Sequence, residues 1–337
     1  MAADRTVVTE LCTALGMLGY ERVRAAALDR SSRLSVDDET WARLADLLDD
    51  PDHRGAADAA FENGAGFLAA SGGLGGRVPR TIVWSAGRRP PGDEVVPADL
   101  LVDHVYLVSC KYRSKVLHNA APSRLFDDQL MAVDRRKRSD WYVDVAPDAS
   151  QALYRATLAA LDVDGLPDRV DDLSPADRKT LKAALRPHSR SELSEDTRQA
   201  YAELVRTVSR GSAERWRRGL GSPERRERML WRLLRIYGAP YFIVGHDGAS
   251  PVRARIATPW DWRQRFALRS FEIEAATAGQ PQVDWAAEVD DHERGDLRVI
   301  EGHIEVRWSH GRFAQPPEAK VYLDTAHHRV PGYEPLA

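Results

Sequence analysis

The spacing of apolar residues changes along the chain and divides it into four regions. Residues 1–55 and 148–237 carry apolar positions three and four residues apart, which predicts amphipathic helices separated by polar breaks. In residues 238–337 apolar and polar positions alternate, which predicts strands bounded by Gly, Pro and Asp. Residues 56–147 contain both patterns. We therefore expect a helical N-terminal region, a mixed core, a helical middle region and a β-rich C-terminal domain.

The mixed region has a definite order of elements. Its pattern predicts a helix at 56–70, a strand at 81–84, a strand pair within 99–111, a helix from Pro122 to about residue 135, and a strand at 141–145. The order helix, strand, strand, strand, helix, strand places the chain in the mixed α/β (α+β) class.

The strand pair carries the most informative chemistry of the chain. Asp99 begins one apolar run, Lys111 ends the next, and only residues 103–104 separate the two runs. A two-residue turn there would place Asp99 opposite Val108, beside Ser109, with Ser109 and Lys111 on one face because side chains alternate along a strand. A carboxylate and an ammonium would then meet at the open end of a hairpin.

That pair of groups suits phosphate chemistry. The carboxylate can hold a divalent metal ion while the lysine stabilises a hydroxide or the charge of a phosphate group. The alternative interpretation of Asp99 and Lys111 is an ordinary cross-strand salt bridge.

At these residues the sequence resembles the PD-(D/E)XK, or restriction-endonuclease-like, nucleases. Residues 97–99 (Pro-Ala-Asp) stand close to the family's Pro-Asp, and residues 109–111 (Ser-Cys-Lys) take the place of its acid-x-Lys. The resemblance covers residues 56–146, and the expected order of elements is that family's αβββαβ core. It implies a nuclease that uses Mg²⁺ or Mn²⁺, with Asp99 as a metal ligand and Lys111 stabilising the attacking hydroxide and the phosphate.

One position departs from the family pattern, because Ser109 stands where a carboxylate is usual. Ser109 would hold a metal-bound water, and the missing acid would come from elsewhere. Glu62, beside the apolar face of helix 56–70, is the first candidate for a catalytic acid and second metal ligand. A solvated helix carboxylate is the competing interpretation. Asp127 and Asp128, on the next expected helix, rank after Glu62.

Charge is distributed unevenly along the chain. The 337 residues carry a net charge of −3, with 29% charged residues, so no global basic character indicates nucleic acid. Residues 206–235, however, hold ten arginines and three glutamates, a local balance of +7, interleaved with Trp216 and Trp231. Such a patch suits phosphate contact and base stacking. A solvated helix face with tryptophans in the core is the alternative.

Specific residues are candidates for contact with a nucleic acid. From the arginine-rich run these are Arg217, Arg218, Arg225 and Arg226. The segment that follows the hairpin adds Ser114 and Asn119, whose donors suit a DNA backbone. A polar loop is the alternative interpretation of that segment.

A second acid-x-Lys lies in the C-terminal domain. Glu318 and Lys320 form this triplet with Ala319, and Glu305 lies on the preceding strand. We rank this cluster second, because Glu318 begins its strand after a proline pair and no helix stands beside it to complete the fold.

Together these features predict a metal-dependent DNA endonuclease, with restriction or antiviral defence as the biology that the resemblance implies. The alternatives are a catalytically inactive nucleic-acid-binding or scaffolding protein with the same fold, and an RNase-type toxin. DNA is the expected partner, and a homodimer is an open option. Without a signal peptide or a membrane-length apolar run, we expect a cytoplasmic protein.

Overall fold

The computed structural model describes residues 3–86, 96, 98–112, 116–131, 140–161, 163, 165–188, 193–247 and 250–336. Its α-helices are α1 (Asp4–Gly16), α2 (Val23–Asp29), α3 (Asp38–Asp49), α4 (Pro51–Ala69), α5 (Pro122–Phe126), α6 (Trp141–Val145), α7 (Pro147–Leu161), α8 (Pro175–Leu185), α9 (Glu195–Gly219), α10 (Pro223–Leu233) and α11 (Pro259–Arg265). Short 3-10 turns lie at η1 (Val170–Asp172), η2 (Arg186–His188) and η3 (His327–Arg329). The mixed α/β class is confirmed.

The strands form two sheets. They are β1 (Leu34–Ser35), β2 (Ile82–Trp84), β3 (Leu100–Val102), β4 (Tyr106–Tyr112), β5 (Val116–Ala120), β6 (Tyr241–Asp247), β7 (Ser250–Ile256), β8 (Phe266–Thr277), β9 (Pro281–Asp291), β10 (Asp296–Arg307), β11 (Glu318–Leu323) and β12 (Tyr333–Pro335). One sheet has the order β1-β2-β3-β4-β6-β7-β12, and the other has the order β5-β11-β10-β9-β8.

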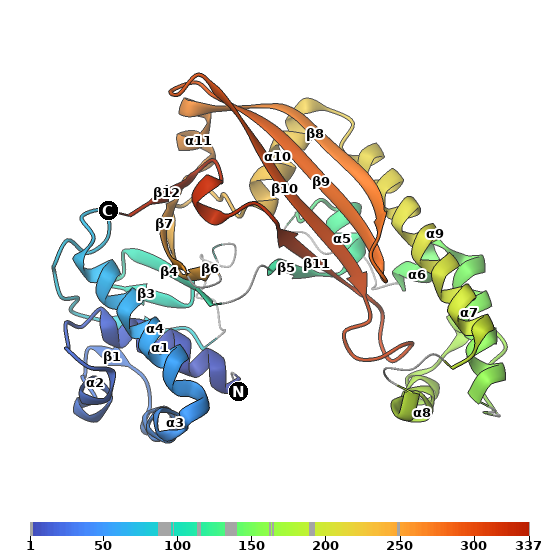
Figure 1. Cartoon of the computed structure of the whole chain (residues 1–337), viewed down its shortest axis with the longest axis horizontal. Coiled ribbons are helices and arrows are strands. Elements are labelled where there is room, and N and C mark those ends of the chain that lie inside the picture. The colour runs from blue at the N-terminus through green and yellow to red at the C-terminus, as the bar shows by residue number, and fades with distance from the viewer. Residues whose placement is uncertain are drawn as a thin grey trace.

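The seven-stranded sheet is mixed. Strands β2, β3 and β4 form an antiparallel meander, and β4 then pairs in parallel with β6, far along the sequence. Helices α1 and α4 pack on one face of these strands, and together they bury a single apolar core (Figure 1). The centre of this sheet is therefore a three-stranded meander with a strand parallel to its last member.

Two glycines set the distance between α1 and α4. A Cβ atom on Gly16 would lie 2.1 Å from the carbonyl oxygen of Phe61, and one on Gly64 would lie 2.0 Å from that of Thr13. Real Cβ atoms do not approach so closely, so only glycine permits this backbone contact. The close approach brings the buried side of α1 down onto the sheet.

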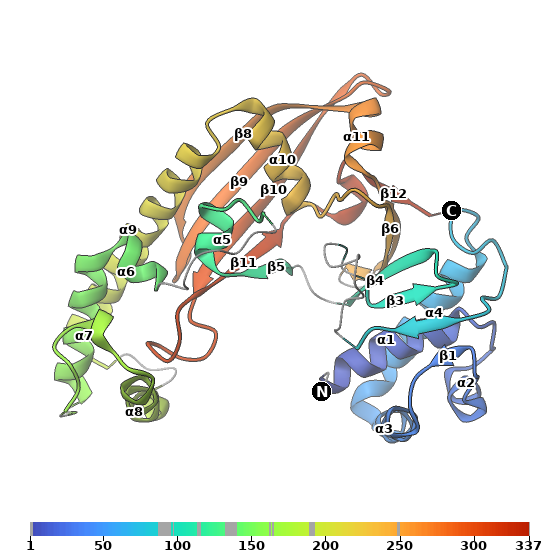
Figure 2. The same ribbon diagram turned by 180° about the vertical axis from the view of Figure 1, so that it is seen from behind.

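The five-stranded sheet is antiparallel throughout and is covered on one face by α9, with α5 and α10 nearby (Figure 2). Burial alternates strictly along β9, so every second side chain packs towards the helices. Strands β8, β9, β10 and β11 lie in residues 238–337, where the alternation predicts strands. Strand β5 lies outside that region, in a segment for which no strand was predicted.

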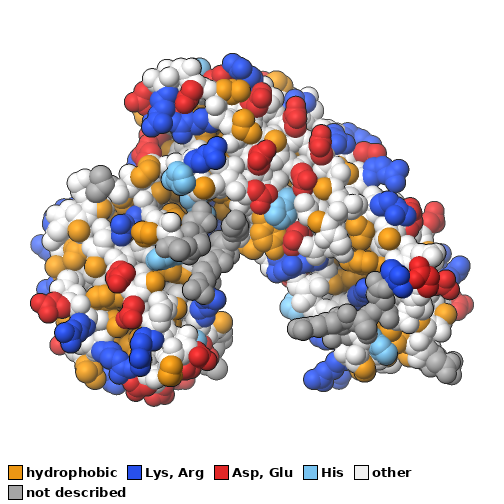
Figure 3. Space-filling view, viewed as in Figure 1, with side chains coloured by type: hydrophobic (Ala, Val, Ile, Leu, Met, Phe, Trp, Pro, Cys, Tyr) orange, Lys and Arg blue, Asp and Glu red, His pale blue; other side chains and the backbone are white. Residues whose placement is uncertain are grey.

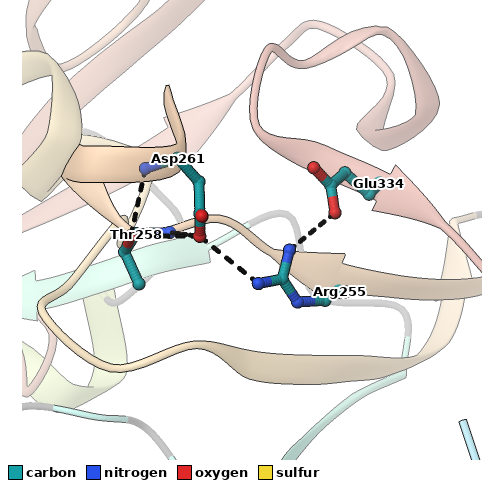
Figure 4. A network of polar contacts seen from close by, with 4 residues as sticks. All are labelled: Arg255, Thr258, Asp261 and Glu334. Carbon is teal, nitrogen blue, oxygen red and sulfur yellow. Dashed lines mark hydrogen bonds and ion pairs between the residues drawn. The ribbon is translucent and has the colours of Figure 1, made fainter. Parts of the chain in front are cut away.

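A polar network fixes the joint between the two sheets. Arg255 on β7 lies 2.8 Å from Glu334 on β12 and 3.3 Å from Asp261 on α11 (Figure 4). Asp261 also forms a capping box with Thr258 at the start of α11. The capping box stabilises the first turn of this short helix, and Trp262 is fully buried beneath it.

Two predicted elements are wrong. Residues 141–145 alternate like a strand but form α6, because the Asp140 side chain caps the helix and Trp141 is buried, donating to Ser212 Oγ at 2.9 Å. The helix expected from Pro122 to residue 135 stops at Phe126, and Gln129 and Leu130 take positive φ angles. The strand that follows the hairpin in the sheet is β6, not residues 141–145, and it pairs with β4 in parallel.

The hairpin forms, but its register differs from the prediction. A two-residue turn would pair Leu100 with Leu107, whereas Leu100 faces Val108 and the turn has three residues, 103–105. Asp103 stabilises this turn by accepting hydrogen bonds from the backbone of Arg80 (2.7 Å) and Thr81 (3.0 Å). The shift by one residue aligns Asp99 with Ser109 instead of Val108.

Candidate active site

Asp99 is held at the start of β3 by the end of β4. Its backbone donates to the carbonyl of Val108 at 2.8 Å. Its Oδ2 atom accepts a hydrogen bond from the backbone of Cys110 at 2.6 Å and one from Ser109 Oγ at 3.3 Å. Ser109 is fully buried, so its hydroxyl positions the carboxylate of Asp99. One backbone hydrogen bond and two hydrogen bonds to the carboxylate therefore hold this residue in place.

Two cations surround that carboxylate. Burial raises the pKa of Asp99, and the charges of Lys111 and Arg235 oppose this rise. Burial and repulsion from Arg235 lower the pKa of Lys111, while Asp99 opposes the fall. Arg235, which follows α10 in a left-handed conformation, has a buried Nε atom with no hydrogen-bond partner in the described part of the chain. Asp99, Lys111 and Arg235 thus interact electrostatically at one end of the central strands.

A buried acid on α1 joins this group, and sequence reasoning missed it. Glu10 is only 8% exposed, and its Oε2 atom accepts a hydrogen bond of 2.6 Å from Trp84 Nε1 at the end of β2. Burial and repulsion from Asp99 raise the pKa of Glu10 to about 7, and the bond from Trp84 and the charge of Lys111 counteract them. A sequence signal existed, because Glu10 is the sole charged residue in the apolar stretch 6–20.

Glu62 does not take the place expected for it. Its side chain is exposed on α4, and no described contact joins it to Asp99 or Lys111. Its neighbour Asn63 is the buried residue, and Asn63 Nδ2 donates to the carbonyl of Gly245 on β6 at 2.9 Å. The inward face of α4 therefore supports the sheet, and the helix that supplies an acid is α1.

The other candidate acids lie in different surroundings. Asp127 Oδ1 is 2.7 Å from Arg215 Nε, an ion pair between the end of α5 and α9. Asp128 is half-buried next to it. Neither has a described contact with Ser109.

Two carboxylates are available to bind a metal ion. Within the described residues no group of three His, Cys, Asp or Glu side chains gathers to form a metal site on its own. Asp99 and Glu10 nevertheless offer oxygen atoms, which Mg²⁺ and Mn²⁺ prefer, and Mg²⁺ commonly uses one or two protein carboxylates together with water and substrate phosphate. Repulsion between the two carboxylates contributes to the raised pKa of Glu10. A cation bound between them would reduce this repulsion.

Three of the four arginines predicted to contact phosphate also donate to main-chain carbonyls of the protein. Arg217 donates to the carbonyl of Ile273, Arg225 to that of Gly219 and Arg226 to that of Leu220. Arg218 is exposed, with no hydrogen bond or ion pair to the described residues. The remaining candidates are Ser114, which lies outside the described residues, and Asn119, which is exposed on β5.

The aromatic residues of that run belong to the core. Trp216 is fully buried and Trp231 nearly so, with edge contacts to Phe271 and Trp262. They cannot stack on bases, and the core interpretation is confirmed for both.

The second acid-x-Lys lies on an acidic surface. Glu305 on β10 faces Lys320 on β11, and Glu305 also contacts Arg307 at 3.1 Å. The same open face of the sheet carries many carboxylates (Figure 3), among them Glu272, Glu274, Asp284, Glu301 and Asp324. An acidic face repels phosphate, so this surface is poorly suited to nucleic acid.

None of the helices in the described part of the chain combines the length and apolar character needed to span a bilayer. Comparisons of the chain with protein family models, curated proteins and solved structures found no match. The function is therefore argued from the fold and the site alone.

Proposed function

We propose that this protein is a metal-dependent nuclease of the restriction-endonuclease-like type that hydrolyses phosphodiester bonds in DNA. The observation that carries the proposal is the meeting of Asp99, Lys111 and Glu10 at one end of the sheet, from β3, β4 and α1. The topology supports it, because helix α4, the antiparallel strands β2, β3 and β4, and a strand parallel to β4 follow in the order expected of an αβββαβ core. Strand β5 and helices α5 to α10 separate β4 from that last strand, β6.

Each residue has a role that follows from its surroundings. Asp99 and Glu10 would hold Mg²⁺ or Mn²⁺, which supplies Lewis-acid stabilisation of phosphate charge when bound. Lys111 and Arg235 place two positive charges beside these carboxylates, where they can stabilise the negative charge that develops on a phosphodiester in the transition state. Ser109 orients Asp99 through its hydrogen bond and does not need to touch the substrate.

The experiment is a cleavage panel. Purified protein is incubated with plasmid DNA, methylated DNA, single-stranded DNA and RNA, in the presence of Mg²⁺, Mn²⁺ or EDTA. We expect cation-dependent cleavage of DNA that is lost in Lys111→Ala and in Asp99→Ala, with folding and DNA affinity retained, because groups that act on transition-state charge change the rate and not binding. Ser109→Ala, which removes the longer of the two bonds to Asp99 Oδ2, should be much milder.

A second candidate, a catalytically inactive nucleic-acid-binding or scaffolding protein with this fold, is favoured by one observation. Ser109 replaces an acid, and no group of three candidate ligands forms among the described residues. Binding of DNA without cleavage under every cation would select it, and cleavage of RNA alone would select an RNase-type toxin. Full turnover by Lys111→Ala would mean that the reaction occurs elsewhere in the molecule.

A further inference from the structure

A groove of about 1150 Å³ lies beside α8 and the N-terminal half of α9. Its other wall comes from the β8–β9 turn (residues 277–279) and the β10–β11 loop (residues 310–312), which Figure 1 shows beside these helices. This volume is slightly above the range of small-molecule pockets, roughly 300–1,000 Å³. The groove can therefore hold a ligand of several linked units.

The charged residues that line the described part of the groove are all basic. Its basic lining residues are Lys179, Lys182, Arg186, His188, Arg198, Arg206, His310 and Arg312, and no carboxylate lines it among the described residues. Arg198 and Arg206 each pair with a glutamate of α9. Lys179, Lys182 and Arg186 are exposed and form no hydrogen bond or ion pair with the described residues. Their spacing of three and four residues places them on one side of α8 and η2.

The floor of the groove is apolar, and its walls are held in place. Leu185, Leu193, Tyr201 and Val205 contribute the floor, and the guanidinium of Arg312 lies 4.7 Å from the centre of the Tyr201 ring. On the far side of α8, Arg178 donates to the carbonyl of Phe313 at 2.9 Å, which ties the helix to the β10–β11 loop. These two contacts connect α9 and α8 to the β10–β11 loop on the other side of the groove.

We propose that this groove binds a short single-stranded oligonucleotide. Unpaired cations along one wall suit a row of phosphates, and an apolar floor with an aromatic ring suits exposed bases, a combination found in single-strand binding sites. A duplex has its bases stacked inside, so it would leave the apolar floor uncovered. This site does not depend on the cleavage chemistry at Asp99, and it lies in a different part of the chain.

The test measures binding in EDTA by the Lys111→Ala protein, so that cleavage plays no part. The probe is a fluorescent twelve-residue oligothymidylate, followed by anisotropy between 50 and 300 mM NaCl. We expect Lys179→Gln/Lys182→Gln/Arg186→Gln to weaken binding at least tenfold and to flatten the salt dependence by roughly two units, since each contact with a single strand contributes about 0.7. Ala202→Glu, which places a carboxylate in the groove, should also lose binding.

The matched control is Arg22→Gln/Arg33→Gln/Arg80→Gln in the same Lys111→Ala background. It removes the same charge from exposed positions that precede β2 in the sequence, and it should bind as the Lys111→Ala protein does. Equal affinity and salt slope of the groove variant and this control would overturn the proposal. So would an absence of oligonucleotide binding at 50 mM NaCl, or binding of phosphatidylserine vesicles in place of the oligonucleotide. A failure of cleavage with binding intact would overturn only the proposed nuclease activity.

Discussion

At the scale of single residues, the proposed nuclease activity depends on Glu10, the buried acid on α1. Glu10 and Glu62 are both glutamates on helices that pack against the same sheet, yet one is buried beside Trp84 and the other is exposed. Glu10→Gln should reduce cleavage by roughly 100-fold or more, as the loss of a charge-stabilising group does. Glu62→Gln is the matched control and should stay within about twofold of the wild type. Rates from single-turnover digestion would decide, and equal losses in both variants would contradict this assignment of roles.

The raised pKa of Glu10 also predicts a pH dependence of stability. The folded pKa of about 7 lies above the ordinary value of 4.5, so the folded state binds the extra proton between these two pH values. The contribution of Glu10 to stability is therefore fully present below pH 4.5 and is lost as pH rises through 7. The upper bound of the change is about 3 kcal/mol, at about 1.4 kcal/mol per pK unit.

Urea denaturation in EDTA at pH 5 and at pH 8 measures this effect. Wild-type protein should lose more stability between these pH values than Glu10→Gln, whose amide oxygen can still accept the bond from Trp84 but cannot ionise. Parallel pH curves for the two proteins would show that Glu10 titrates normally.

Sequence alone identified the residues of the hairpin but not their partners. Asp99 and Lys111 lie within a segment whose pairing is local, so alternation and a short turn are enough to bring them together. Glu10 was missed because the helix nearest in sequence to the hairpin is α4, and only the packing of α1 across the sheet brings Glu10 to Asp99. Exposure of Glu62 depends on which side of α4 faces the sheet, and this is set by Asn63 and the glycine contact with α1.

At the scale of elements, local pattern failed where tertiary packing overrides it. Residues 141–145 alternate as a strand should, yet burial of Trp141 and the cap from Asp140 produce a helix. The strand that does lie beside β4 is β6, which is separated from it by the whole helical middle region. The spacing of apolar residues does not show which strands pair when they lie far apart in the sequence. The pairing of β4 with β6 across the helical middle region therefore could not be predicted.

The contact between α1 and α4 gives a prediction at this scale. Gly64→Ala would place a Cβ atom 2.0 Å from the Thr13 carbonyl, which forces the helices apart and moves Glu10 from the sheet. We expect a loss of about 2–3 kcal/mol in the free energy of unfolding. Gly55→Ala, in the same helix but with open space around it, should instead gain about 0.5–1 kcal/mol from helix propensity. Chemical denaturation of both variants provides the comparison, and similar changes at both positions would contradict the close-packing argument.

At the scale of the whole molecule, charge is divided among surfaces with different roles. The open face of the five-stranded sheet is acidic, the groove beside α8 is basic, and the site at Asp99 combines both signs. The cluster of Glu305, Glu318 and Lys320 lies within the acidic surface, where Glu318 accepts hydrogen bonds from Ser309 and Asn119 that lower its pKa. A nucleic acid approaching this protein is therefore expected to avoid that sheet and to meet the basic surfaces.

The arginine-rich run supplies the last prediction. A local balance of +7 suggests that Arg217, Arg218, Arg225 and Arg226 bind phosphate together, which would flatten the salt dependence of DNA binding by nearly four units in the quadruple alanine variant. Arg217 donates through two nitrogens to the carbonyl of Ile273, whereas Arg218, Arg225 and Arg226 are exposed and keep their charge and further donors. We therefore expect a change of about two to three units, together with a lower melting temperature from the lost contact of Arg217 with β8. Salt titration of duplex binding and thermal denaturation of the same variant measure both quantities. An unchanged slope in the folded variant would show that this run does not contact the DNA.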